Sequence, residues 1–344
     1  MSIDLSKLAT AHRLLFAIPL KPVQGSRFQP TGFPGLGAAT FRTADGDSLL
    51  VESAQSMANR FEVTVWDEAE HRLKPDLEGI SHVTVTNAEG QFLTDSILEA
   101  HRLNSPYVLN AIKDNELFFE TLGNRLDAFT TGAIDRRKLA DTLLALDVSC
   151  LIHGLFLSAN INKKTLAGGR LRVARALSAF IEADGVQVAA SGGVKNDHVN
   201  PSGETKTGFG NVPFARDEFT AESVTLYVNL DLGQIRGYGL GAEVERLLIV
   251  LSLYKLRSLL DGNLRLRSAC DLCVATTSIT ATSPLGFSLP DISALTAEMK
   301  SAIGVTREKM QVTRVAYCEK IEPKKSSDKE ADEETDIEEQ TAED

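Results

Sequence analysis

A chain of 344 residues with a hydrophobic content of 43% can bury a large core in one or two domains. It lacks an apolar run of membrane-spanning length and a signal-peptide pattern, and 4 cysteines are too few for a disulfide framework, so we expect a cytoplasmic protein without a membrane partner. The net charge of −11 is unevenly placed, because residues 319–344 hold 12 acids and 4 bases, which leaves −3 for residues 1–318. A nearly neutral body can still carry a local basic groove for nucleic acid.

The N-terminal segment is predicted to form a strand over residues 12–23. Its prolines lack the amide hydrogen that a sheet interior needs, so we expect a strand at a sheet edge or one that ends early. A glycine- and proline-rich loop follows over residues 24–37, with one cation, Arg27, and one aromatic ring that we expect to be exposed, Phe28. Glycine lets backbone amides approach a ligand closely, so this loop can wrap a sugar-phosphate chain; a plain turn is the alternative.

A helix is predicted from Asp47, as its N-cap, to about Phe61, because apolar residues recur there at helical spacing. The other face of this helix carries Ser53, Asn59 and Arg60. Two interpretations of that polar face remain open: it is solvated, or it packs against RNA or a neighbouring subunit.

The middle of the chain is predicted to form a helix, a strand and a second helix. The first helix spans residues 136–146, and the apolar, β-prone run 148–158 is expected to be a central strand. The run 168–172 leads into a helix that ends near Ala183. The arginines clustered at its start form the most basic patch of the body, either a solvated surface or a rail for phosphates. They include Arg170 and Arg172.

Residues 191–217 form a long insert between a short predicted strand at 186–190 and a better one at 223–232. The insert has no helical or strand period, and a loop of this length inside a domain is usually functional or disordered. Its cations suit phosphates and its rings suit bases, although a mobile surface loop with incidental cations is the alternative. The polar and aromatic candidates are Lys195, Asn196, His198, Lys206, Phe209, Asn211, Phe214 and Arg216.

The last third of the chain holds two weak chemical motifs. Residues 237–242 fit the dinucleotide-binding pattern G-x-G-x-x-A, but no βαβ repeats surround them, and a glycine-rich helix start also binds nucleic-acid phosphate. The pair Cys270 and Cys273 lacks two further ligands for zinc. Further elements are predicted as a helix from about residue 242 to 260, a strand at 264–277, a helix at 291–303 and a strand at 310–319.

Four ordered blocks of this sequence form a longer pattern than either motif. The first two are LKPVQGSRFQPTGF at residues 20–33 and LLVESAQSMANR at residues 49–60. The third lies within residues 192–220 and comprises GGVKND, GFGNVPF and DEFT. The last comprises NLDL and QIRGYGLG within residues 229–241. Together the blocks, spread over roughly residues 12–280, resemble the backbone subunit of the type I-G (formerly I-U) CRISPR surveillance complex, a RAMP protein of the Cas-seven family. This resemblance is far more specific than the glycine motif.

The resemblance implies an α+β fold with a modified RNA-recognition-motif (ferredoxin-like) core, a long thumb-like β-hairpin insertion and further insertions. The body would span residues 1–321, with the thumb at about 191–217, and a disordered acidic tail would follow over 322–344. Copies of such a protein polymerise along a CRISPR guide RNA, and target DNA pairs with the held guide. The implied partners are guide RNA, target DNA through the guide, further copies of the chain and other Cascade subunits.

Residue chemistry and the resemblance together give one set of expected RNA contacts. They are Lys21, Gln24, Ser26, Arg27, Phe28, Gln29, Ser53, Asn59, Arg60, Arg170, Arg172, Lys195, Asn196, His198, Lys206, Phe209, Asn211 and Arg236. The sequence departs from ordinary RNA-recognition motifs because their aromatic RNP signature is absent. Without a triad, Walker loop or zinc-protease motif, we expect no catalysis, cofactor or metal. Two alternatives stay open: a nucleotide-dependent oxidoreductase using residues 237–242, and a RAMP endoribonuclease.

We expect residues 322–344 to be removable without loss of fold or RNA binding. Their acidic composition, with almost no hydrophobic residues, cannot offset the entropy of ordering them. Thermal melting and RNA titration of the truncated protein test this expectation. A truncated protein that melts much earlier, or no longer assembles, would show that the tail docks on the body.

Overall fold

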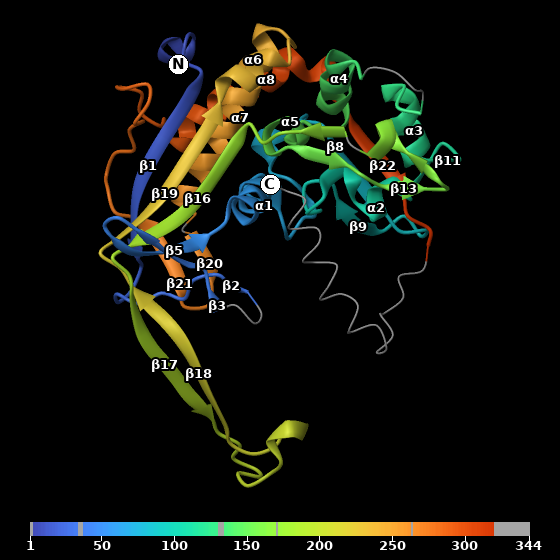
Figure 1. Ribbon diagram of the computed structural model, residues 1–344. Helices are drawn as coiled ribbons and strands as arrows, with labels where there is room; N and C mark the ends of the chain where they lie inside the picture. The colour runs from blue at the N-terminus through green and yellow to red at the C-terminus, as the bar shows by residue number, and fades with distance from the viewer. Residues whose placement is uncertain (1–2, 34–36, 130–133, 170, 263, 320–344) are drawn as a thin grey trace.

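The computed structural model describes residues 3–33, 37–129, 134–169, 171–262 and 264–319 (Figure 1). Arg170 and the expected acidic tail therefore lie outside the described residues. Helices and strands alternate along the chain, and the strands form one antiparallel sheet of seven, one mixed sheet of five and several two-stranded ribbons. The protein is of the α+β class, as the sequence predicts.

The seven-stranded sheet has the order β20-β21-β1-β19-β16-β5-β4. Alternate side chains of its central strands are buried, such as Leu177, Ala179 and Ile181 of β16, because only one face of the sheet is covered. Figure 1 shows α1, α7 and α8 on the covered face. The strands are β1 (Arg13–Pro22), β4 (Thr40–Thr43), β5 (Gly46–Glu52), β16 (Leu177–Asp184), β19 (Ser223–Asp231), β20 (Leu264–Arg267) and β21 (Cys270–Val274).

Side-chain caps mark where several of the helices begin. The carboxylate of Asp135 accepts the N–H groups of Arg137 and Lys138, and that of Asp291 accepts the N–H of Ala294. Within the described ranges, no helix is both long and apolar enough to cross a membrane. The helices are α1 (Ala54–Val63), α2 (Pro106–Leu109), α3 (Phe118–Leu126), α4 (Arg136–Leu146), α5 (Ser149–His153), α6 (Leu232–Gly237), α7 (Ala242–Asp261) and α8 (Ile292–Thr306).

A second sheet of five strands completes the body, and β22 runs parallel to β8 within it. Its strands are β8 (His82–Thr86), β9 (Phe92–Asp95), β10 (Ile112–Lys113), β11 (Glu116–Leu117) and β22 (Val312–Ala316). The short ribbons pair β2 (Gly32–Phe33) with β3 (Gly37–Ala38), β6 (Trp66–Asp67) with β7 (Arg72–Leu73), β12 (Leu155–Leu157) with β15 (Leu171–Val173), and β13 (Asn160–Ile161) with β14 (Lys164–Thr165).

The first strand is not at an edge, contrary to the expectation from its prolines. β1 lies between β19 and β21 in the sheet interior. The carbonyl of Pro19 accepts the N–H of Ala275 at 2.9 Å, and β21 ends one residue earlier, at Val274. Because Pro19 has no N–H to donate to the neighbouring strand, the hydrogen bonding between β1 and β21 stops at this position. The proline therefore limits the neighbouring strand and leaves β1 intact.

The helix predicted from Asp47 to Phe61 is wrong in its first half. Residues 46–52 form β5, which pairs with β4, and α1 begins only at Ala54. The hydroxyl of Ser53 caps α1 by accepting the N–H of Ser56 at 3.3 Å. The sequence does contain a signal for a buried strand here, namely a hairpin turn before Gly46 followed by consecutive apolar residues. The helical spacing of the apolar residues obscured this signal.

Two further predictions between residues 148 and 183 are wrong. The expected central strand at 148–158 is mostly α5, followed by the short β12. The expected helix ending near Ala183 is instead β15 followed by β16. Apolar residues in β16 satisfy both helical spacing and strict alternation, and the alternating set is the one that is buried. The helices at 136–146, 242–260 and 291–303 agree with α4, α7 and α8.

A buried polar network joins the helices behind the large sheet. Arg102 donates two hydrogen bonds of 2.7 Å to the Glu62 carboxylate of α1, and both side chains are buried. Lys255 of α7 donates to the Ser149 hydroxyl at 3.0 Å and contacts His153 Nε2 at 2.9 Å, both on α5. Burial raises the pKa of Glu62 to about 7 despite the adjacent guanidinium, and it lowers the pKa of Lys255 to about 8.

We expect Arg102→Leu to destabilise the fold by about 3–5 kcal/mol, because it leaves the Glu62 carboxylate buried without a partner. A carboxyl whose folded pKa is raised from its ordinary 4.5 binds more protons in the native state than in the unfolded state. The variant should therefore lose stability as the pH rises from 5 to 8. Urea unfolding at both pH values measures this loss, and adding Glu62→Gln should restore part of it. Equal stability of Arg102→Leu at pH 5 and pH 8 would contradict the assignment.

Candidate nucleic-acid interface

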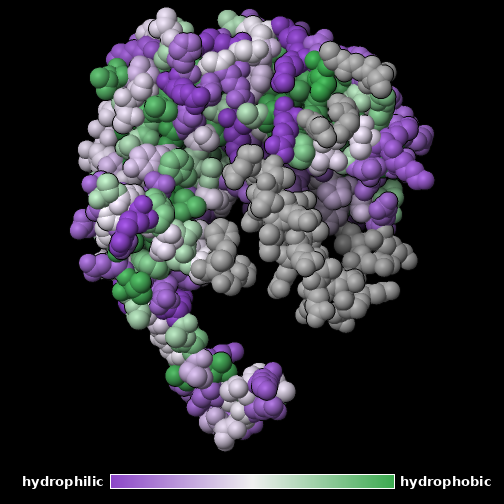
Figure 2. Space-filling view, viewed as in Figure 1, coloured by the Kyte–Doolittle hydropathy of each residue, from purple (hydrophilic) through white to green (hydrophobic). Residues whose placement is uncertain are grey.

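The expected insert is a long β-hairpin that projects from the body (Figure 1). Its strands, β17 (Gln187–Lys195) and β18 (Val212–Thr220), pair without interruption from one end to the other. Figure 2 shows that this ribbon stands clear of the rest of the molecule. The hairpin thus extends beyond the predicted range 191–217 at both ends, and the parts 191–195 and 212–217 of that range are strand. Glycines and small polar residues hid the alternation, because they have little hydropathy to reveal it.

A glycine pair in β17 makes room for an aromatic ring from β18. Gly193 lies opposite Phe214, and a Cβ atom there would come within 3.2 Å of the Phe214 ring. At Gly192 a Cβ atom would lie 2.6 Å from the carbonyl oxygen of Phe214. The ring therefore packs over the glycine backbone, and 53% of the residue stays exposed. This arrangement presents a flat aromatic face of the kind on which a base stacks.

The tip of the hairpin is a folded loop built around one carboxylate. Asp197 accepts the N–H groups of Val199, Asn200 and Gly210 at 2.8–2.9 Å. The side chain of Asn211 in turn accepts the N–H of Asp197 at 2.8 Å. These backbone donors lower the pKa of the Asp197 carboxyl. Asn211, one of the expected RNA contacts, therefore shapes the loop.

The tip presents cations and a second ring to solvent. Lys195, His198 and Lys206 are exposed and form no ion pair with any residue that the structure describes. Phe209 is 56% exposed, and Asn196, which follows Lys195 in the chain, is also exposed. Exposed apolar rings next to free cations are unusual in a surface ribbon, and they match the chemistry of a single nucleic-acid strand.

The N-terminal loop pairs with the base of the hairpin. Phe28 donates its N–H to the Phe219 carbonyl at 2.9 Å and accepts the N–H of Phe219 at 2.8 Å. Phe28 is only 1% exposed, which corrects the expectation of an exposed ring. Its side chain is packed in the hydrophobic core and so anchors the base of the hairpin. Beside it, Arg27 lies 3.6 Å from the Glu218 carboxylate. Two sequence blocks that resemble the CRISPR subunit thus meet here.

A pocket of about 560 Å³ opens between this loop and the hairpin base. Gln24, Ser26 and Arg27 line it, and Lys21 is exposed on the adjoining β1. Glu218 and Asp271 also line it, so one guanidinium faces two carboxylates. The pocket is therefore polar without being strongly basic, and its charge alone would not concentrate phosphates.

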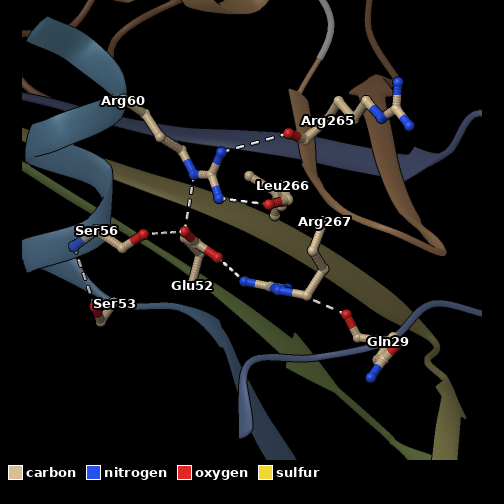
Figure 3. Close-up of polar contacts among 8 residues, drawn as sticks. All are labelled: Gln29, Glu52, Ser53, Ser56, Arg60, Arg265, Leu266 and Arg267. Atoms are coloured by element: carbon tan, nitrogen blue, oxygen red, sulfur yellow. Dashed lines mark hydrogen bonds and ion pairs between the residues drawn. The ribbon is translucent and has the colours of Figure 1, made fainter. Parts of the chain in front are cut away.

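One buried carboxylate links the second sequence block to the rest of this region (Figure 3). Glu52, at the end of β5, is 1% exposed and accepts the Nε–H of Arg60 at 2.8 Å. It also accepts hydrogen bonds from the Ser56 hydroxyl and from an Nη–H of Arg267. We call these four residues the Glu52 clamp. Ser56 and Arg60 come from α1, whereas Arg267 comes from β20, so the clamp spans the sheet.

The clamp reaches the N-terminal loop and the β20–β21 hairpin through backbone carbonyls. Arg60 donates to the Leu266 carbonyl at 2.6 Å, and Arg267 donates to the Gln29 carbonyl at 3.1 Å. The guanidinium of Arg60, an expected RNA contact, is thus engaged within the fold. Arg265 was not among the expected contacts; its side chain is exposed and points away from the clamp in Figure 3.

The remaining expected contacts divide between the surface and the fold. Ser53 caps α1, whereas Asn59 is exposed on the same helix. Arg236 donates to carbonyls of Leu8 and Ala11 and so holds the N-terminus against α6. Such partners lie far apart in the chain, and no local pattern in the sequence reveals them.

The arginine patch lies far from the hairpin. The guanidinium of Arg172 stacks over the Phe156 ring, 4.2 Å from its centroid. This patch stands at the start of β16 and the hairpin follows the end of β16, so an eight-residue strand, about 26 Å long, separates them. Figure 1 shows β17 and β18 continuing from the lower end of β16. The structure therefore does not gather all the expected contacts into one surface.

Neither weak motif has the structural context that its chemistry requires. Residues 237–242 lie between α6 and α7, and the adjoining sheet is antiparallel, so the strand–turn–helix of a dinucleotide site is missing here. Cys270 and Cys273 both lie on β21, and both thiols are free. In the described part of the chain, no group of three or more possible metal ligands comes together.

The sequence matches the family described as CRISPR-associated protein GSU0053 over residues 14–188. The chain belongs to this CRISPR-associated family. No curated protein matches it. A chain of the solved structure titled "CRISPR RNA-guided surveillance complex, pre-nicking" is similar at 14% identity, over 71% of this chain and 70% of that chain, with a TM-score of 0.33. A TM-score that low does not establish a common fold.

The family match confirms the CRISPR resemblance of the first two sequence blocks. It begins in β1 and ends at the second residue of β17, so it contains the N-terminal loop and the Glu52 and Arg60 part of the clamp. The hairpin tip lies beyond it. In this CRISPR-associated protein, Phe28, Glu52 and Arg60 therefore lie within the matched region, whereas Arg267 and β18 lie beyond it.

We expect Glu52→Gln to destabilise the fold by about 3–5 kcal/mol, because it leaves two partly buried guanidiniums without their shared countercharge. Asp47→Asn is the matched control, since Asp47 pairs with Arg42 at 2.9 Å on the exposed side of the same strand. An exposed pair of that kind contributes little to stability, because solvent screens it. Chemical unfolding compares the two variants, and limited proteolysis reports whether residues 24–29 loosen. A Glu52→Gln variant as stable as the control would mean that the Glu52 clamp does not stabilise the fold.

Proposed function

We propose that this chain is a non-catalytic backbone subunit of a type I CRISPR surveillance complex that binds guide RNA through its hairpin. The observation that carries the proposal is the projecting β17–β18 ribbon, which exposes two phenylalanine rings and the ammonium groups of Lys195 and Lys206, neither of which forms an ion pair with a described residue. Membership of a CRISPR-associated family supports it. In this role the hairpin acts as the thumb that folds over the guide RNA.

The chemistry of the hairpin suits a strand of any sequence. Phe209 and Phe214 offer faces to bases, and every base has a face that stacks. Lys195 and Lys206 attract phosphates, which are the same in every nucleotide. The guide's own bases would then remain free to read target DNA by pairing, so specificity lies in the RNA and not in the protein.

Assembly along the guide follows from repeated use of one interface. Identical subunits on a linear polymer need a head-to-tail contact that does not close, which generates an open helical filament. Further copies of the chain and other Cascade subunits are the proposed protein partners. The large antiparallel sheet, covered by helices on one face, would be the modified RNA-recognition-motif core that carries the thumb.

Replacing residues 196–211 with Asn-Gly tests the proposal directly. The new turn would join Lys195 to Val212, which already pair across the hairpin, so both strands keep their register. The melting temperature should change little, because the replaced segment buries no large apolar side chain. Single-stranded RNA binding should weaken strongly, and mass photometry should show shorter assemblies on long RNA.

The single substitution Phe209→Ala tests whether the Phe209 ring stacks on a base or is only exposed to solvent. It should cost about 1–3 kcal/mol of RNA affinity if the ring stacks on a base. Val199→Ala is the control, because Val199 is 95% exposed in the same tip and has no ring. Fluorescence anisotropy at two salt concentrations measures both. Full RNA binding by the protein with the replaced tip would place the thumb elsewhere, and the N-terminal loop around Arg27 would become the first candidate.

A further inference from the structure

A second pocket lies at the end of the body away from the hairpin. It measures about 530 Å³, within the range of small-ligand sites, and its walls come from α4, α5, α6 and the segment that contains β15. Figure 1 shows α4 and α6 close together at the upper edge of the body. The proposed role of the hairpin makes no use of this pocket.

The charge of this pocket is one-sided. Three arginines line it, Arg136, Arg137 and Arg172, and none of the described residues that line it is acidic. Arg137 is compensated by Asp141 at 3.0 Å. Arg136 and Arg172 form no ion pair with any residue in the described ranges. Two uncompensated guanidiniums on one cavity attract an anion, in contrast to the pocket at the hairpin base, where carboxylates offset Arg27.

The pocket is also preformed. The Tyr238 hydroxyl donates to the Leu151 carbonyl at 2.8 Å, and the Gln234 amide reaches that hydroxyl and the Ala174 carbonyl, each at 2.6 Å. Arg137 donates to the Gly239 carbonyl and so ties α4 to the loop after α6. The Phe156 ring supports the guanidinium of Arg172 from one side. Little further ordering is needed before a ligand binds.

The lining combines these cations with an apolar wall. The wall consists of Leu139, Ala140, Leu151, Val173 and Ala174. An inorganic anion would leave such a wall unused, whereas a nucleotide uses both parts, with its phosphate at the guanidiniums and its base or sugar on the wall. Guanidinium also matches phosphate in planar, two-pronged geometry better than an ammonium does.

We propose that the pocket between α4, α6 and β15 binds a nucleotide phosphate, with Arg136 and Arg172 as its ligands. The same chemistry is offered by a free mononucleotide and by one nucleotide unit of a single strand. In either case the site is separate from the hairpin. It gives the subunit a second nucleotide contact, which the length of β16 separates from the base of the hairpin.

The test titrates the full chain with adenosine and uridine monophosphates and with a short single-stranded oligonucleotide. The variant combines Arg136→Gln with Arg172→Gln. Arg314→Gln is the control, because Arg314 is an exposed arginine of β22 that does not line the pocket. Calorimetry should show binding weakened at least tenfold in the double variant and unchanged in the control. If the double variant melts early, Arg136→Gln alone serves, with a smaller loss.

The protein with the replaced hairpin tip distinguishes this site from the proposed thumb. Mononucleotide binding that survives tip replacement and needs both arginines supports a free nucleotide as the ligand. Binding of the oligonucleotide alone, with the same arginine dependence, supports a strand. The proposal is overturned if no nucleotide binding depends on the two arginines, or if an oligoglutamate peptide binds there and nucleotides do not.

Discussion

The position of the hairpin depends on a single buried carboxylate. Glu52 holds Arg60 and Arg267, which come from opposite ends of the sequence, and Arg267 in turn holds the backbone at Gln29. The next residue towards the N-terminus, Phe28, pairs with the base of β18. These contacts connect the buried Glu52 carboxylate, through the N-terminal loop, to the β17–β18 hairpin. Burying three charges is costly, and it is offset only because each guanidinium also satisfies backbone carbonyls.

The distribution of charge matters more here than the total. The chain is acidic overall, yet the hairpin tip carries free cations and the pocket beside α4 carries two uncompensated guanidiniums. Between them, the pocket at the hairpin base has no excess of positive charge among the described residues, because Glu218 and Asp271 face Arg27. Attraction for phosphate is therefore concentrated at two ends of the body. A strand that crosses the middle would be held by shape and stacking more than by charge.

The sequence predicted those elements whose pattern is long and unambiguous. Residues 136–146 and 242–260 are helices because their apolar spacing extends over several turns, and 223–232 is a strand because strict alternation extends along it. The predictions for segments 47–61 and 168–183 were wrong because their short apolar runs fit the helical period and the strand period equally well. Only the sheet, assembled from distant strands, decides between them.

Some properties of the candidate site could also be predicted from the sequence, and others could not. Exposure of the hairpin tip was predictable, because polar and glycine-rich segments have nothing to bury. The roles of Phe28, Arg60 and Arg236 were not, because each depends on a partner brought close by the fold. Arg267 lies 215 residues from Glu52 in the chain, a separation over which no local pattern carries information. The family resemblance marks whole segments and does not say which of their side chains face outward.

A two-stranded ribbon that leaves the body has little core of its own and is marginal in isolation. The hairpin is held at both ends: Phe28 extends its base by a third strand segment, and Asp197 organises its tip. Between these supports, the Phe214 ring lies over Gly193 and supplies apolar contact that the glycine cannot. That ring can support the ribbon and still meet a ligand, because one face packs on the backbone and the other is open. Supports at the ends therefore leave the middle of the ribbon free to present aromatic surface.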